Sequence, residues 1–144
     1  MSKNQVPQIK LTDWTVGTTG ATAASGAIID TDGYEGVLFL AKIESTAATD
    51  QLVALGGTAT NAMSEYTGPN QGEASGVLAN LYLDVFRPKK RYVQGQVFAS
   101  AGGKNLEVLT ILYGPREMPI TQTTTVWNGR ELATPNTGTA TASG

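Results

Sequence analysis

Apolar and polar side chains alternate along three neighbouring runs of this sequence, and that alternation limits the fold more than any other feature. The runs cover residues 77–86, 91–100 and 105–114. A period of two is typical of a β-strand that buries one face, because successive side chains of a strand point to opposite sides. Short connections around Pro88 and at residues 101–104 separate the runs. The pattern therefore predicts three antiparallel strands that follow one another as a meander.

The same alternation assigns the two faces of each strand. The residues assigned to the core are Val77, Ala79, Leu81, Leu83, Val85, Val93, Val97, Ala99, Leu106, Val108 and Leu112. In the third run we assign Glu107 and Thr110 to the solvent side because both side chains are polar. Each run then has one apolar side, which indicates a sheet with one buried face.

Two further strands are predicted upstream of these runs. In residues 36–44, Phe39, Ala41 and Ile43 share one face, and the polar residues between them point to solvent. Residues 51–57 are apolar and end in a pair of glycines. Short apolar runs that end at glycine are typical of strands rather than of helices.

The segments around these two strands carry turn signals. A short strand is expected at residues 27–30, followed by a hairpin turn at Asp32-Gly33, because glycine supplies the positive φ that such turns need. Residues 58–76 are rich in small residues and read as a long surface excursion, with one turn of helix near residues 61–65.

Both ends of the chain are predicted to extend from the body as arms. The N-terminal part, residues 1–25, is expected to form a strand or arm, residues 26–120 the body, and residues 121–144 a C-terminal arm that orders on a partner. An edge strand near the N-terminus is predicted from Val6, Ile9, Leu11 and Trp14. The stretch that follows, residues 15–26, reads as a loop.

Composition supports the same fold class. The chain has 144 residues, of which 15% are charged and 17 are glycine, and its length suits one domain with its own core. Segments rich in Leu, Glu and Lys, which favour helices, are scarce. We therefore expect an all-β protein: an antiparallel β-sandwich, jelly-roll-like, with extended N- and C-terminal arms.

The chain offers few side chains for catalysis. It contains no cysteine and no histidine, which removes thiolate nucleophiles, histidine-dependent triads and most transition-metal sites. Asp30, Asp32 and Glu35 partly resemble a calcium loop, but turn chemistry explains the Asp-Gly pair without a metal. We expect no enzyme activity, no cofactor and no metal. No apolar run reaches the length of a membrane span, and no secretory signal is expected.

Four of the ten basic residues form one cluster, Arg87, Lys89, Lys90 and Arg91. The cluster could neutralise phosphates, carry solvated charge at a strand corner, or anchor a protein partner. The net charge of −2 and the lack of a second basic stripe with aromatic residues argue against nucleic acid. Arg87 and Arg91 are the better anchors because arginine forms bidentate pairs with carboxylates.

Aromatic residues form the second group of candidates. Trp14, Tyr34, Tyr66 and Trp127 could stack against a sugar or anchor a protein interface. Trp127 and Arg130 lie in a threonine-rich tail, where tryptophan and arginine are typical of interface hot spots. The alternative is that Trp127 folds back onto the sandwich. We assign Trp14, Trp127 and Arg130, with the basic cluster, to partner binding.

Three segments of the sequence resemble a known class of proteins. These segments are IIDTDGYEGVLFLAKI, LYLDVFRPKKRYVQGQV and ILYGPREMPI, followed by an ELATPNTGTA tail. Over about residues 26–138 they are similar to cement, or decoration, proteins of podophage-type tailed bacteriophages. The resemblance implies a jelly-roll-like sandwich that binds the outer capsid surface and stabilises the shell by bridging its subunits. It brings no active-site residues with it.

The expected partners follow from that resemblance. They are the major capsid protein and a second copy of this chain, as a homodimer more than a trimer, with no nucleic acid and no membrane. The protein would be made in the host cytoplasm and work on the virion. The alternatives are another virion component, such as a head fibre, tail or adaptor subunit, or a carbohydrate-binding β-sandwich module.

Overall fold

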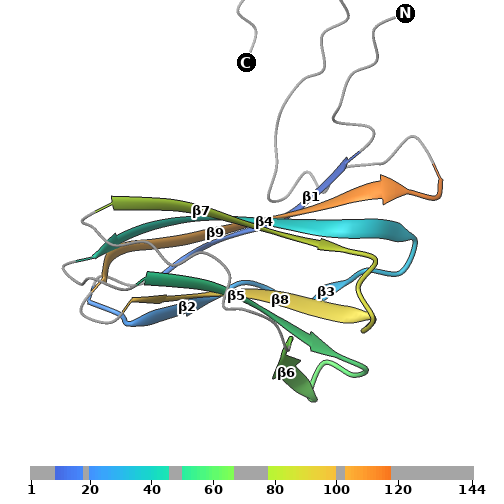
Figure 1. Cartoon of the computed structure of the whole chain (residues 1–144), viewed down its shortest axis with the longest axis horizontal. Helices are drawn as coiled ribbons and strands as arrows, with labels where there is room; N and C mark the ends of the chain where they lie inside the picture. Colours follow the sequence, from blue (N-terminus) through green and yellow to red (C-terminus); the bar gives the residue numbers. More distant parts are fainter. Residues whose placement is uncertain (1–8, 18–19, 46–49, 67–77, 100–102, 118–144) are drawn as a thin grey trace, which may run out of the picture.

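Two antiparallel β-sheets packed face to face make up the part of the chain that the structure describes (Figure 1). The structure is a computed structural model, and it describes residues 9–17, 20–45, 50–66, 78–99 and 103–117. The strands within these residues are β1 (Ile9–Val16), β2 (Ala23–Ser25), β3 (Ile29–Asp30), β4 (Tyr34–Ser45), β5 (Asp50–Gly57), β6 (Met63–Glu65), β7 (Leu78–Phe86), β8 (Tyr92–Ala99) and β9 (Gly103–Pro115). The predicted all-β antiparallel sandwich is confirmed.

The strands pair in a nested order. One sheet has the order β1-β9-β4-β7, and the other has the order β2-β8-β5-β6, with β3 also paired to β8. Along the chain, β1 pairs with β9, β2 and β3 pair with β8, β4 pairs with β7, and β5 pairs with β6. Strands that are distant in sequence therefore lie side by side in both layers.

The core lies between the two sheets, on the strand faces that the alternation predicts. Phe39, Ala41 and Ile43 of β4 are buried, and Val93 and Val97 of β8 face them from the other sheet. The remaining predicted core residues that are buried are Leu83, Ala99, Leu106, Val108 and Leu112. Val6 and Val77 lie outside the described residues. The period-two pattern thus identified the buried faces of β4, β7, β8 and β9 correctly, with Leu81 and Val85 of β7 only partly buried.

Phe39 of β4 packs directly against the backbone of β8. A Cβ atom added at Gly95 would lie 2.6 Å from Cδ1 of Phe39, closer than non-bonded carbon atoms come. Gly95 is paired with Ala54 of β5, so small residues line the position opposite the ring. The phenylalanine occupies the space that the missing side chain leaves.

The predicted meander is wrong. β7 and β9 both pair with β4 in the four-stranded sheet, whereas β8 lies in the other sheet between β5 and the β2 and β3 strands. The chain therefore crosses the sandwich between β7 and β8 and crosses back before β9. Alternation shows which face of a strand is buried, but it does not show to which of the two sheets the strand belongs. Strands that are neighbours in sequence were therefore wrongly predicted to pair.

Thr110 is also corrected. It was assigned to solvent, yet its side chain is fully buried on the same face of β9 as Val108 and Leu112. Its Oγ1 has no hydrogen-bond partner among the described residues. Position in the alternation outweighs polarity here, because a threonine has nearly the shape of a valine and fits the same core position.

The turn at Asp32-Gly33 exists, but it does not close a hairpin. The Tyr34 N–H donates to the Thr31 carbonyl at 3.1 Å, and Gly33 has a φ of 88°. The strands on either side lie in different sheets, because β3 pairs with β8 while β4 pairs with β7 and β9. The predicted turn of helix at residues 61–65 is wrong, since β6 occurs there and pairs with β5.

The N-terminal region supplies strands to both sheets. β1 pairs with β9 at the edge of the four-stranded sheet, as predicted, and β2 arises within the stretch expected to be a loop. The C-terminal arm at residues 121–144 lies outside the described residues. Nowhere in the described ranges does a helix have the length and apolar character that crossing a membrane would take.

Candidate binding site

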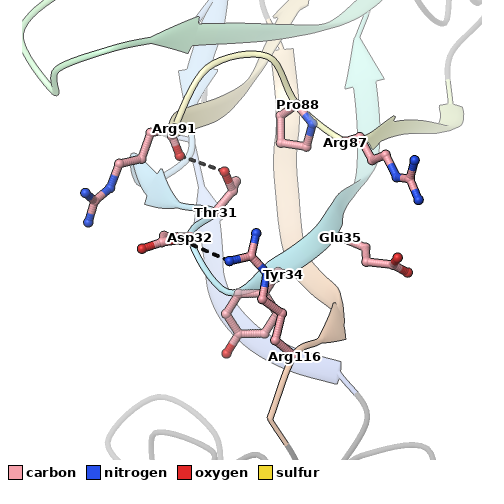
Figure 2. A pocket seen from close by; sticks show the side chains of 8 residues that line it. All are labelled: Thr31, Asp32, Tyr34, Glu35, Arg87, Pro88, Arg91 and Arg116. Carbon is pink, nitrogen blue, oxygen red and sulfur yellow. Dashed lines mark hydrogen bonds and ion pairs between the residues drawn. The ribbon is translucent and has the colours of Figure 1, made fainter.

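Three chain segments meet at one end of the sandwich and enclose a hollow rich in arginine. They are the β3–β4 turn, the β7–β8 connection and the residue after β9 (Figures 1 and 2). The hollow has a volume of about 600 Å³. It is lined by Thr31, Asp32, Tyr34, Glu35, Arg87, Pro88, Arg91 and Arg116. We call it the arginine pocket.

Backbone hydrogen bonds hold the three segments together. The Arg116 N–H donates to the Gly33 carbonyl at 2.9 Å, which ties the end of β9 to the β3–β4 turn. The Thr31 N–H and Oγ1 both donate to the Arg91 carbonyl, at 2.9 and 2.7 Å, which ties the same turn to the β7–β8 connection. The pocket is thus built on anchored turns next to regular strands.

Arg87 marks the point where the chain leaves β7. Its φ of 48° lies in the left-handed region, which costs an ordinary residue about 1–2 kcal/mol. The following Pro88 already disfavours the right-handed helical conformation for the residue before it. The Arg87 N–H donates to the Glu35 carbonyl at 2.7 Å, and its guanidinium lies 5.0 Å from the centre of the Phe86 ring. Within the described ranges its side chain forms no ion pair.

Arg91 is held by a carboxylate of the neighbouring strand. Its Nε donates to Asp30 Oδ1 at 3.0 Å, and its Nη2 donates to Asp30 Oδ2 at 2.7 Å. The hydrogen bond from Arg91, with a further one from the Asp32 N–H, lowers the pKa of the Asp30 carboxyl. The guanidinium of Arg91 also lies 5.5 Å from the centre of the Tyr92 ring. This bidentate pair fixes the orientation of Arg91 at the pocket wall.

Arg116 is held more loosely. Its Nη1 lies 3.9 Å from Asp32 Oδ1, and both side chains are largely exposed. In Figure 2, Arg87 and Arg91 extend to opposite sides of the pocket, while the guanidinium of Arg116 lies between them beside Asp32. Arg87 and Arg116 are therefore the two guanidinium groups that an incoming carboxylate could recruit at little cost.

The arginine pocket carries charges of both signs. It combines three arginines with the carboxylates of Asp32 and Glu35, so it presents both signs of charge to a partner. Burial raises the pKa of the Tyr34 hydroxyl, which keeps that group neutral. Among the described residues, no group of three or more acidic side chains is arranged to hold a metal ion. Guanidinium groups in this arrangement can pair with an oxyanion such as a carboxylate or a phosphate.

We predict that the Asp30–Arg91 pair makes stability depend on pH in the acid range. The folded-state pKa of Asp30 is lowered, so its stabilising contribution is present above the unfolded pKa near 3.9 and is lost as pH falls through the folded value. Asp30→Asn should therefore melt below the wild type at pH 6, and the difference should vanish towards pH 2. Melting curves from pH 2 to 6 measure it.

The matched control for this prediction is Asp32→Asn, which removes the looser contact with Arg116. Because exposed ion pairs contribute little, both effects should be small and should decrease in high salt. A melting difference for Asp30→Asn that stays constant across the pH range would contradict the assignment.

A second exposed feature lies on the outer face of the four-stranded sheet. The register places Trp14 opposite Leu109, Leu109 opposite Leu40, and Leu40 opposite Tyr82. We call these four residues the outer row. Trp14 is 55% exposed and Tyr82 is 73% exposed, and the Trp14 Nε1 donates to Glu107 Oε2 at 3.2 Å. Large apolar side chains thus cross the whole width of the sheet on its solvent side.

The predicted site residues separate into three groups. Arg87 and Arg91 line the pocket, whereas Lys89 and Lys90 are exposed in the same connection and do not line it. Trp14 lies on the other surface, in the outer row. Trp127 and Arg130 lie outside the described residues, and so do any contacts they make.

Several residues of these surfaces were missed by the sequence analysis. Arg116 follows the Gly-Pro pair that ends β9, and only the nested pairing brings it to the β3–β4 turn. Tyr82 was not singled out as a candidate, although the alternation leaves it on the side of its strand away from the predicted core. The sequence shows that Tyr82 alternates with Leu83, which is buried. It does not show the cross-strand register that places Tyr82 beside Leu40. In comparisons with protein families, curated proteins and solved structures, no match to this chain is found.

Proposed function

We propose that this chain is a bacteriophage virion protein that binds the outer surface of the capsid and stabilises it by bridging capsid subunits. The observation that carries the proposal is the outer row, where Trp14, Leu40 and Tyr82 stand exposed on an open sheet face. Clusters of large exposed apolar side chains mark interaction surfaces in soluble proteins. Tryptophan and tyrosine are also the residues that most often dominate protein interfaces.

The strand order also supports the proposed role on a capsid. The nested pairing, with first strand against last, is the pairing expected of a jelly roll, in which a long hairpin of strands rolls up into two sheets. We infer that this sandwich is a jelly roll. That architecture is common in capsid and lectin domains, so it is compatible with the proposed role without defining it.

The arginine pocket would add specificity to such a contact. Arg87 and Arg116 would donate hydrogen bonds to a carboxylate of the major capsid protein, while the outer row supplies apolar contact area. On a particle surface many copies bind side by side, so a modest contact at each site is sufficient for stable occupancy.

The test uses shells of the phage that encodes the chain, prepared without it. Added wild-type protein should co-sediment with the shells and raise their melting temperature. The double variant Trp14→Ala/Tyr82→Ala should bind at least about tenfold more weakly, because it removes two aromatic anchors. Phe98→Ala is the matched control, since Phe98 is an exposed aromatic residue of the other sheet.

Two outcomes would reject the proposal. If shells with and without the protein resist heat and low salt equally, the protein does not stabilise the capsid. If labelled protein is found on the tail or on fibres by electron microscopy, it is another virion component.

A carbohydrate-binding module is the second candidate. The observation that favours it is the exposed indole of Trp14 beside the carboxylate of Glu107, because sugar sites combine an aromatic face with polar groups. Binding on a glycan array that is lost in Trp14→Ala, together with no binding to shells, would replace the capsid proposal with this one.

A further inference from the structure

Strand β7 forms one edge of the four-stranded sheet. Among the described residues it pairs with β4 alone, in a register without any shift from Leu78 to Phe86. It contains no proline, and Asp84 is its single charged residue. A straight edge strand of this length is a template for pairing with another strand unless something protects it.

The direction of the backbone groups on β7 follows from one hydrogen bond. The Arg87 N–H donates to the Glu35 carbonyl, and these two residues are opposite each other in the continuing register of β4 and β7. In an antiparallel pair, hydrogen-bonded and non-hydrogen-bonded positions alternate. The odd-numbered residues of β7 therefore bond to β4. The even-numbered ones, with Tyr82 at the centre, direct their N–H and C=O groups away from it.

We propose that the partner of this edge is the same strand of a second copy, paired antiparallel about a twofold axis at Tyr82. In that register Tyr82 lies opposite Tyr82 of the second copy, Asn80 opposite Asp84, and Leu78 opposite Phe86. All five facing positions are hydrogen-bonded pairs, so the contact gains about ten backbone hydrogen bonds. The proposal does not depend on the capsid role.

The side chains of this register are compatible with self-pairing. Each Asp84 meets an amide, not another carboxylate, and the two Asp84 residues are about 13 Å apart along the strand direction. Asp84 Oδ1 already accepts a hydrogen bond from Tyr113 Oη at 2.6 Å, which fixes the carboxylate and leaves its second oxygen to accept from another donor. The amide of Asn80 from the second copy can donate to it. Like charges are thereby kept apart.

Self-pairing also joins the two outer rows. Tyr82 is the β7 member of its row and is the residue on the axis, so the row of one copy continues directly into the row of the other. The dimer would present one apolar row across eight strands, with a Trp14 at each end. Eight strands at about 4.8 Å spacing give a span of roughly 34 Å. A second copy of the chain, paired at the β7 edge, thus extends the outer row.

A single introduced cysteine tests the twofold position. The chain has no cysteine of its own, and paired Cα atoms about 5.5 Å apart are within disulfide range. Tyr82→Cys should form a covalent dimer under mild oxidation. Phe86→Cys is the control, because the two copies of position 86 would be about 26 Å apart. Equal cross-linking of both variants, or of neither, would overturn the proposal.

A charge exchange gives an independent measurement. Asn80→Asp places a carboxylate opposite Asp84 at two symmetric positions, and the dimer dissociation constant from sedimentation equilibrium should rise roughly tenfold. Adding Asp84→Asn to that variant restores the amide–carboxylate pair and should recover most of the affinity. A wild-type protein that stays monomeric at millimolar concentration, with the Tyr82 amide protected from hydrogen exchange, would show that another segment covers this edge and would reject the dimer.

Discussion

Phe39→Ala is expected to lower the free energy of unfolding by about 3–5 kcal/mol, the largest loss of any single truncation considered. Phe39 is fully buried, and it belongs to β4, which pairs with strands on both sides. Its ring fills the space over Gly95, where β8 has no side chain of its own to occupy the vacancy. The lost contacts therefore remain as a cavity.

Urea denaturation followed by circular dichroism measures this loss. Leu40→Ala is the matched control: Leu40 is the next residue, faces the opposite side and is 37% exposed, so it should lose about 1 kcal/mol or less. Because typical domains are stable by only 5–15 kcal/mol, Phe39→Leu provides a milder variant if the alanine protein does not fold. Equal losses at positions 39 and 40 would contradict the placement of the core.

Gly95→Ala is expected to destabilise the protein by about 1–3 kcal/mol although it adds only one methyl group. That methyl would lie 2.6 Å from Phe39 Cδ1 and about 3.0 Å from two further ring atoms. In an exposed strand the same change would be mildly favourable, since alanine costs less backbone entropy than glycine. A loss of stability in Gly95→Ala, rather than a gain, would thus show that the two sheets approach closely at this position.

A double-mutant cycle isolates this contact. Combined with Phe39→Leu, which shortens the side chain over the site, Gly95→Ala should cost less than it does alone, with a coupling of about 0.5–3 kcal/mol. The four proteins are compared by urea denaturation under identical conditions. Effects that add to within about 0.5 kcal/mol would show that the two residues do not touch.

The sequence predicted the faces of strands better than their neighbours. Phe39, Val93 and Val108 were assigned to the core because alternation is a local property of each strand. Which strands pair depends on the connections between them. After β7 the chain crosses to the other sheet at Arg87, and the local sequence pattern does not indicate the positive φ of that residue. The polarity of Thr110 was likewise a weaker guide than its position.

The candidate surfaces were predictable only in part. Arg87 and Arg91 were recognised because they are clustered in sequence. Trp14 was recognised because exposed aromatic side chains can stack on a sugar or anchor a protein interface. Arg116 joins the pocket through a backbone bond to Gly33, and Tyr82 joins the outer row through its pairing with Leu40. Both depend on contacts between segments far apart in the chain, which composition and spacing do not encode.

The nested pairing limits how far the protein can fold while it is still being synthesised on the ribosome. Trp14 of β1 and Glu107 of β9 are hydrogen-bonded although they are 93 positions apart. At 5–20 residues per second, β1 must wait on the order of ten seconds before its partner strand is made. During that interval β4 and β5 have neither β8 nor β9 beside them, so their apolar faces are exposed to solvent. Folding is therefore expected to be largely post-translational and slow, as is usual for folds dominated by distant contacts.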